Sequence, residues 1–215
     1  IVSFLIYKSI LSQKQKSELQ NTFGKYPPKK VIDFFLENPK ELKLWGIQQN
    51  IVVFFLDIEW FTWLSEKHNP EKLLSILNDM FSSFTETISN NNGTVDKYMW
   101  DAVMAFWWAP LKLEHMTSDS LKATLWIIKD MQEKFKLAYQ VNVRIWLHLW
   151  EAVVGNMWAE DFYSYTAIWD TVNTWSRLEW INKYYGTTII MSEEYVNDLE
   201  DYEKDLAWIF YLDTI

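Results

Sequence analysis

A continuous apolar run, IVVFFLDI at residues 51–58, ends close to an acidic residue, Asp57. A run without polar alternation is typical of a central β-strand that is buried on both faces. Such a strand needs pairing partners on each side and a layer of structure over each face. The run therefore predicts a sheet at the centre of a mixed domain, with Asp57 at the end of the central strand.

The helix and strand signals after this run occur in a definite order. They are a helix opened by Pro70 and closed by Gly93, the strands TVDKYM and AVMAFW joined at Trp100 and Asp101, a helix over 118–138, and the strand VNVRIWLHLWEAVVG. The order βαββαβ predicts a ferredoxin-like α+β core. A helix from about Asp170, the short strand TTIIMS and a helix capped by Ser192 are expected as additions.

Composition excludes several classes of function. The formal net charge of -9 argues against a nucleic-acid partner, because proteins that bind phosphate backbones gather Lys and Arg on one face. The chain has no Cys, and its three His residues, His68, His115 and His148, are too scattered for a zinc motif. Carboxylates are therefore the expected metal ligands.

The first 50 residues are expected to form a linker region. The run IVSFLIY is shorter than the roughly 20 residues that span a bilayer, so it is either the tail of a membrane helix or a buried strand or helix end. Lys8, Lys14 and Lys16 follow it and would suit the cytoplasmic side of a membrane. We expect residues 1–50 to combine the end of a possible membrane helix with a helical linker, and 51–215 to form the catalytic domain.

Two acids and one polar pair are candidate site residues. Asp57 at a strand end and Asp101 at a hairpin tip could share a divalent metal ion, since Mg²⁺ prefers oxygen ligands. The alternative is that both are solvated turn acids. Asn173 and Arg177 are four residues apart and share a helix face, which would suit a sugar and a phosphate. From spacing alone they are equally compatible with an exposed helix face.

Five separated segments resemble the catalytic domain of class III nucleotidyl cyclases. They are FFLDIEWFTWLSE, GTVDKYMWDAVMAFW, LHLWEAVVGNMW, YTAIWDTVNTWSRLE and INKYYGTTIIMSE. The upstream GKYPPKKVIDFFLENPKELKL is similar to the segment that precedes this domain in membrane-anchored cyclases. The resemblance implies the class III cyclase fold, signal transduction through a cyclic nucleotide, an upstream membrane sensor and a cytoplasmic catalytic domain anchored to the inner membrane.

The resemblance also implies roles for individual residues. Asp57 and Asp101, with the backbone of Ile58, would hold two Mg²⁺ ions, for which Mn²⁺ could substitute. The backbone from Ile58 to Thr62, including Phe61, is similar to the triphosphate cradle of the family. Asn173 would orient the ribose, and Arg177 would stabilise charge at the α-phosphate. In the family each site is shared across a head-to-tail homodimer, so a monomer is expected to be inactive.

The resemblance places Lys97 and Thr166 at the positions that select the base. Lysine can donate to adenine N1 and threonine can accept from the N6 amino group, which favours ATP over GTP. We therefore expect an adenylate cyclase that forms cyclic AMP and pyrophosphate, and we interpret His148 as structural. The alternatives are a guanylate cyclase or a non-catalytic module that only dimerises or binds nucleotide. A diguanylate cyclase is disfavoured because the chain lacks a GGDEF-like hairpin.

Tryptophan stands where the family pattern has glycine at Trp60, Trp100, Trp108, Trp146, Trp150, Trp158, Trp169 and Trp180. The chain holds 14 Trp but only 5 Gly; Trp45, Trp63, Trp126, Trp175 and Trp208 could extend the set, whereas Trp107 matches a family tryptophan. Left-handed backbone costs a non-glycine residue about 1–2 kcal/mol, and overpacking costs about 1–3 kcal/mol. A gene that uses UGA for glycine, translated with UGA as tryptophan, would give this pattern. We therefore expect these eight residues to be glycine in the cell.

The sequence ends at YLDTI, before the strand pair that supplies a phosphate-binding lysine in the family. We therefore expect the catalytic domain to be truncated at its C-terminal end. One triphosphate contact implied by the resemblance has no counterpart in this sequence.

Overall fold

The computed structural model describes residues 37–38, 45–109, 112–157, 164–168, 181–207, 209 and 211–212. The expected membrane-proximal run, most of the linker and the first part of the helix expected from Asp170 lie outside the described residues, whereas residues 181–185, at the end of that helix, are helical. None of the helices in the described ranges is both long enough and apolar enough to cross a bilayer.

The described strands form one mixed sheet. They are β1 (Trp45–Glu59), β2 (Thr94–Met99), β3 (Ala102–Trp107), β4 (Asn142–Met157), β5 (Ser164–Ile168) and β6 (Ile189–Met191). Their order is β2-β3-β1-β4-β5 with antiparallel neighbours, and β6 pairs with β4 in parallel. The long strand β1 is central, as the apolar run predicted, and the ferredoxin-like α+β arrangement is confirmed.

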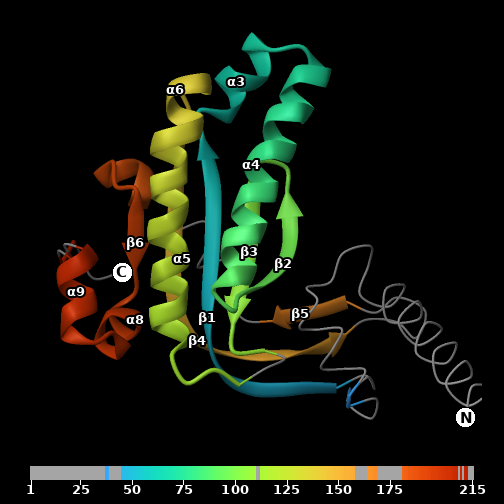
Figure 1. The fold of residues 1–215 in the computed structure, drawn as a ribbon. Helices are drawn as coiled ribbons and strands as arrows, with labels where there is room; N and C mark the ends of the chain where they lie inside the picture. Colours follow the sequence, from blue (N-terminus) through green and yellow to red (C-terminus); the bar gives the residue numbers. More distant parts are fainter. Residues whose placement is uncertain are drawn as a thin grey trace, which may run out of the picture.

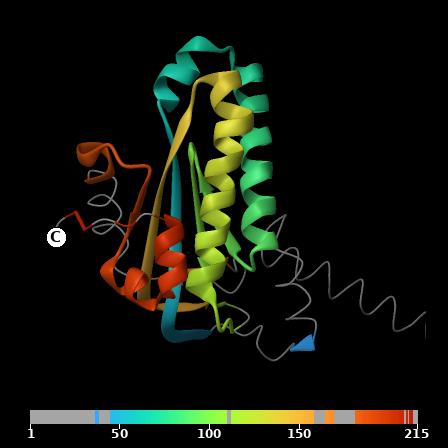
Figure 2. The same cartoon turned by 60° about the vertical axis from the view of Figure 1, so that its left-hand side comes forward.

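The described helices lie mainly on one face of this sheet. They are α3 (Phe61–Lys67), α4 (Pro70–Asn90), α5 (Met116–Asp130), the π-helical turn η2 (Met131–Phe135), α6 (Lys136–Tyr139), α8 (Glu193–Asp198) and α9 (Asp201–Ala207). Figures 1 and 2 show α4 and α5 side by side across the sheet, and the two helices are in contact. The C-terminal end of β1 and the β2–β3 turn lie at the same end of the sheet.

The predicted element boundaries agree closely with the structure in the hairpin and differ elsewhere. TVDKYM and AVMAFW are β2 and β3 with the same ends. β1 begins at Trp45 rather than at Ile51, because its polar first residues pair with the second half of β4 and so continue the strand. The helix expected over 118–138 is interrupted by η2, and its flanking helices extend from Met116 to Tyr139.

Alternate residues of β1 fill two separate cores. Val52, Phe54 and Leu56 pack into the core beneath α4 and α5, while Val53 and Phe55 pack into the core on the opposite face. All five are buried. A strand with both faces covered has no polar alternation, which explains the apolar run in the sequence.

Helix α4 is delimited by residues at its two ends. The side chain of Asn69 accepts from the Lys72 N–H at 2.8 Å, and Pro70 occupies the first turn, where its missing N–H costs nothing. Beyond the helix, the Gly93 N–H donates to the Ile88 carbonyl at 2.9 Å. A Cβ on Gly93 would lie 2.7 Å from the Trp107 ring, so the chain needs glycine here for close packing.

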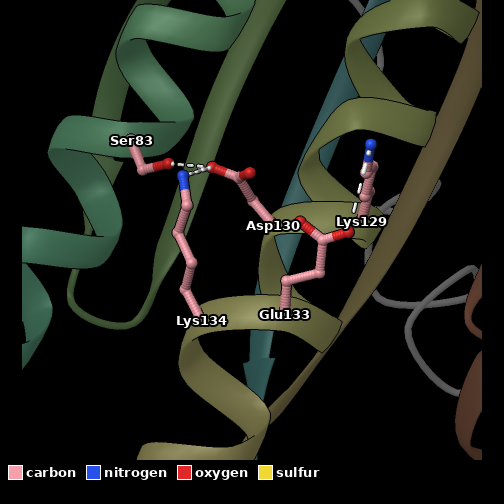
Figure 3. A network of polar contacts seen from close by, with 5 residues as sticks. All are labelled: Ser83, Lys129, Asp130, Glu133 and Lys134. Carbon is pink, nitrogen blue, oxygen red and sulfur yellow. Dashed lines mark hydrogen bonds and ion pairs between the residues drawn. The ribbon is translucent and has the colours of Figure 1, made fainter.

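Helices α4 and α5 are also joined by polar contacts on the side away from the sheet. The Asp130 carboxylate accepts from Ser83 Oγ and from Lys134 Nζ, each at 2.8 Å, as Figure 3 shows. Partial burial would raise the pKa of Asp130, but the hydrogen bonds from Lys134 and Ser83 outweigh it and lower that pKa. Lys129 and Glu133 form a longer ion pair of 3.9 Å nearby. This cluster links α4 to the end of α5 and the start of η2.

Three of the tryptophans that replace family glycines have left-handed backbones. The φ angles are 67° at Trp60, 54° at Trp100 and 110° at Trp108. Trp146 and Trp150 lie inside β4, so left-handed strain does not apply to them. The remaining three, Trp158, Trp169 and Trp180, lie outside the described residues. The strain argument from the sequence therefore holds at the turns and is wrong for the two strand positions.

Candidate active site

The two candidate metal ligands are at adjacent strand ends. Asp57 pairs in register with Ala102 of β3, and the Ile58 N–H donates to the Asp101 carbonyl at 3.0 Å. Both acids are partly exposed at the edge of the sheet. The structure thus brings together the residues that the sequence could only place separately, and two partly exposed carboxylates are a donor set that fits Mg²⁺.

Arg144 was not among the residues expected from the sequence, yet it lies beside Asp57. It is the register partner of Asp57 on β4, with its guanidinium 3.7 Å from the Asp57 carboxylate and 2.7 Å from that of Glu59. A lone basic residue in an otherwise apolar strand was the available signal, since Arg is rarely buried without a partner. The site therefore contains a guanidinium group, that of Arg144, as well as the two candidate metal ligands Asp57 and Asp101.

The segment from Ile58 to Thr62 turns the chain from β1 into α3. Trp60 is the residue before the helix, it is 64% exposed, and its side chain makes no capping hydrogen bond. Phe61 and Thr62 form the first turn of α3, where backbone N–H groups lack partners within the helix. The position fits a phosphate cradle, and Trp60 is the residue directly before it.

Lys97 and Thr166, the two residues predicted to select the base, are in contact, although they come from strands at opposite ends of the sheet order. The Lys97 Nζ lies 3.3 Å from Thr166 Oγ1, within hydrogen-bonding distance. Figure 1 shows β1 and β4 bending beneath β2 and β3, which brings β5 alongside, and β2 contacts β5. Curvature of the sheet therefore creates this part of the site.

Asp96, a second residue that the sequence did not single out, joins this pair. Its carboxylate accepts from Thr166 Oγ1 at 2.8 Å and lies 3.2 Å from Lys97 Nζ. Burial raises the pKa of Asp96, an effect that Lys97 and the Thr166 hydrogen bond only partly oppose. Asp96 is an acid in a short strand, and its burial depends on the contact with Thr166 of β5, which could not be seen from the β2 sequence alone.

Three predicted site residues remain: Asn173, Arg177 and His148. Asn173 and Arg177 lie outside the described residues, so their roles stay predictions. His148 is half-buried in β4 and stacks on Trp150, and burial lowers its pKa, which agrees with a structural role. Within the described ranges there is no group of three or more His, Cys, Asp or Glu residues that could hold a metal. Asp57 and Asp101 therefore stay a predicted pair of metal ligands.

Solved structures of cyclases share this architecture. A bacterial light-regulated adenylyl cyclase superposes with a TM-score of 0.72 at 22% identity, covering 93% of this chain and 58% of that one. The guanylyl cyclase Cya2 superposes with a TM-score of 0.65 at 23% identity, covering 74% of this chain and 82% of that one. At these identities the likeness establishes the class III cyclase fold.

Sequence comparison agrees over most of the chain. Adenylate cyclase 1 of Rhizobium meliloti (strain 1021) is 31% identical over 189 residues, which cover 85% of this chain but 28% of that protein. The chain therefore spans less than a third of that relative's length. The family model for the adenylate and guanylate cyclase catalytic domain matches residues 46–207. The chain belongs to the family of adenylate and guanylate cyclase catalytic domains.

Proposed function

We propose that this domain is an adenylate cyclase that converts ATP into 3′,5′-cyclic AMP and pyrophosphate. The observation that carries the proposal is the joint placement of Asp57 and Asp101 at adjacent strand ends of one sheet whose β2 also carries Lys97. In the reaction the ribose 3′-oxygen bonds to the α-phosphorus, the bond to the β-phosphate oxygen breaks, and the 3′-hydroxyl proton is lost. Pyrophosphate is the leaving group.

The chain's own residues would perform separate tasks in this reaction. Asp57 and Asp101 would hold Mg²⁺, which when bound supplies positive charge to the triphosphate and acidifies the 3′-hydroxyl. Arg144 is ion-paired to Asp57 in the ligand-free protein. A cation that captures Asp57 would weaken that pair, which would leave the guanidinium able to contact a phosphate. Lys97 and Thr166 would bind the adenine edge.

A guanylate cyclase is the first alternative, because the family includes both adenylate and guanylate cyclases. A non-catalytic module is the second alternative, favoured by Trp60, a bulky residue directly before the proposed phosphate cradle, where close approach of the backbone to phosphate favours glycine. Both alternatives can be separated by assaying two forms of the domain. The tryptophan form has the sequence as it stands, and the glycine form has glycine at the eight positions that replace family glycines.

Replacing either acid should abolish the activity of the glycine form. Asp57→Ala and Asp101→Ala each remove a ligand for the cation, and we expect cyclic AMP formation to fall at least about 100-fold, because a bound metal supplies several kcal/mol of charge stabilisation. The matched control is Asp79→Ala, which removes an exposed acid on α4 and should leave the rate unchanged. Full activity in both site variants would refute the metal-ligand assignment.

The dimeric site is a finer part of the proposal. The acids would come from one chain, with Asn173 and Arg177 from its partner. A mixture of Asp57→Ala and Arg177→Ala chains should then regain about a quarter of the parent activity, because half of a random mixture is heterodimer with one intact site of two. The control mixture of Asp57→Ala with Asp101→Ala should stay inactive, since both defects lie on the same side. Equal recovery in the two mixtures would contradict a shared site.

The cellular setting also remains a proposal. The chain covers 28% of the length of its Rhizobium meliloti relative, so that relative has further segments. We propose that an upstream sensor and a membrane anchor precede this domain and hold it on the cytoplasmic side, which is supported by the apolar run and lysines near residue 1. Expression of the longest open reading frame, followed by membrane fractionation, tests this directly.

A further inference from the structure

Asp96 lies in a β-bulge, which changes the direction of its side chain. The β2–β3 register shifts between Val95 and Lys97, so Asp96 has no register partner on β3. In a regular strand, neighbouring side chains point to opposite faces. An extra residue breaks that alternation. The bulge thus explains how the Asp96 carboxylate and the Lys97 ammonium, on consecutive residues, come within 3.2 Å of each other.

Asp96 is an unusual residue to bury if its purpose is stability. Its side chain is 1% exposed, and its Oδ1 has no hydrogen-bond partner within the described part of the chain. A buried polar atom without a partner costs about 1–3 kcal/mol. The carboxylate nevertheless binds both residues proposed to contact the base. The burial of Asp96 is therefore better explained by its bonds to Lys97 and Thr166 than by a contribution to stability.

The hydrogen-bond directions around Thr166 follow from the chemistry of its partners. A threonine hydroxyl has one proton, and here Thr166 Oγ1 donates it to Asp96 Oδ2 at 2.8 Å. A carboxylate can only accept, so the direction of this bond is fixed. Towards any other group, Thr166 can then act only as an acceptor. The Lys97 ammonium has three N–H donors. Two of them point to Asp96 and Thr166, and the third is available to a ligand because the ammonium is partly exposed.

We propose that Asp96 is a positioning residue that sets the base preference by fixing Thr166 as an acceptor and Lys97 as a donor. This inference rests on the proposed function and names the device behind its choice of nucleotide. Adenine presents an amino donor at position 6 and an acceptor at N1, which complements that pair. Guanine presents an acceptor at position 6 and a donor at N1, which opposes it. Without the carboxylate, Thr166 would be free to donate to guanine.

Asp96→Asn tests the device with almost no change in shape. The amide can donate to Thr166 Oγ1, which releases the hydroxyl proton, and it removes the negative charge beside Lys97. We expect the ratio of dissociation constants for the α,β-methylene analogues of GTP and ATP to fall about 10-fold to 100-fold, the effect of one or two hydrogen bonds. KM for ATP should rise more than kcat falls, because the base lies away from the reacting phosphate. Asp79→Asn is the matched control.

A double-mutant cycle separates positioning from a merely structural role. If Asp96 acts through Thr166, Asp96→Asn should change the preference little once Thr166→Val has removed the hydroxyl. Additive effects of the two substitutions would overturn the inference, as would an unchanged preference in Asp96→Asn. The glycine form and the tryptophan form are both measured. Asp96→Ala is the second variant should Asp96→Asn unfold, and unfolding of both would show that the residue serves the fold instead.

Binding and turnover distinguish failure of the inference from failure of the proposed function. A parent domain that forms neither cyclic nucleotide would refute the proposed function, yet the analogue dissociation constants would still test Asp96. A parent that cyclises ATP but shows no preference for ATP over GTP would keep the cyclase and overturn the inference. Loss of preference in Asp96→Asn with the melting temperature unchanged supports it.

Discussion

The two ends of β3 each carry a tryptophan, and their environments are opposite. Trp107 is fully buried, its indole N–H donates to the Asn91 carbonyl at 2.6 Å, and its ring packs edge-on against Phe54 with centroids 5.8 Å apart. Trp100, in the β2–β3 turn, is 90% exposed and has a left-handed backbone. One tryptophan gains by leaving water and satisfies its N–H, whereas the other combines exposed apolar surface with backbone strain.

Whether the neighbouring structure has room for a tryptophan side chain also differs between Trp107 and Trp100. Gly93 leaves room for the Trp107 ring, so this glycine and this tryptophan fit each other. Trp100 stands where a two-residue hairpin turn favours Gly or Asn, and Trp60 repeats the situation at the end of the neighbouring strand β1. Packing accounts for a tryptophan at position 107, but it does not account for a tryptophan at position 60 or 100. That difference is what the hypothesis of UGA-encoded glycine predicts.

The largest effect is expected at the buried end. Trp107→Ala should lower the free energy of unfolding by about 3–5 kcal/mol, because it leaves a large cavity and frees a buried carbonyl partner. Urea denaturation followed by circular dichroism measures the loss. Trp126→Ala on the exposed side of α5 is the control and should change stability by less than about 0.5 kcal/mol. Equal losses in the two variants would mean that burial does not distinguish these tryptophans.

At the β2–β3 turn we expect substitution of the tryptophan to increase stability rather than decrease it. Trp100→Gly should raise the free energy of unfolding by about 1–2 kcal/mol, because glycine adopts the left-handed conformation without steric strain. The same denaturation assay measures the gain, and a loss of stability would show that the indole serves the fold. The gene supplies an independent check: UGA codons are expected at Trp60, Trp100 and Trp108, with UGG at Trp107. UGG at all four would end the glycine hypothesis.

How far the sequence predicted the structure depends on the range of the contacts involved. The hairpin strands were predicted to the residue, because the strand-forming residues and the turn between them are local signals. The polar start of β1 was missed, since only pairing with β4 makes it a strand. Arg144 and Asp96 were missed for a similar reason: one is defined by its register against Asp57 and the other by a bulge and the approach of β5. Asn173 and Arg177 remain predictions.

The smallest expected change in the free energy of unfolding is at Gln140, and it separates the cost of a left-handed backbone from the effect of the tryptophan side chain. Gln140 closes α6 with φ at 58°, close to that of Trp100, but it is a flexible polar residue that the glycine hypothesis does not involve. Gln140→Gly should therefore stabilise the domain by about 0.5–1 kcal/mol, the part of the gain that comes from the left-handed backbone alone. Urea denaturation of Gln140→Gly, Trp100→Gly and the double variant measures the two gains together. They should add, because the two substitutions lie on separate elements of the fold. If Trp100→Gly gains no more than Gln140→Gly, the indole contributes nothing beyond its backbone angle, and the two ends of β3 differ less than their environments suggest.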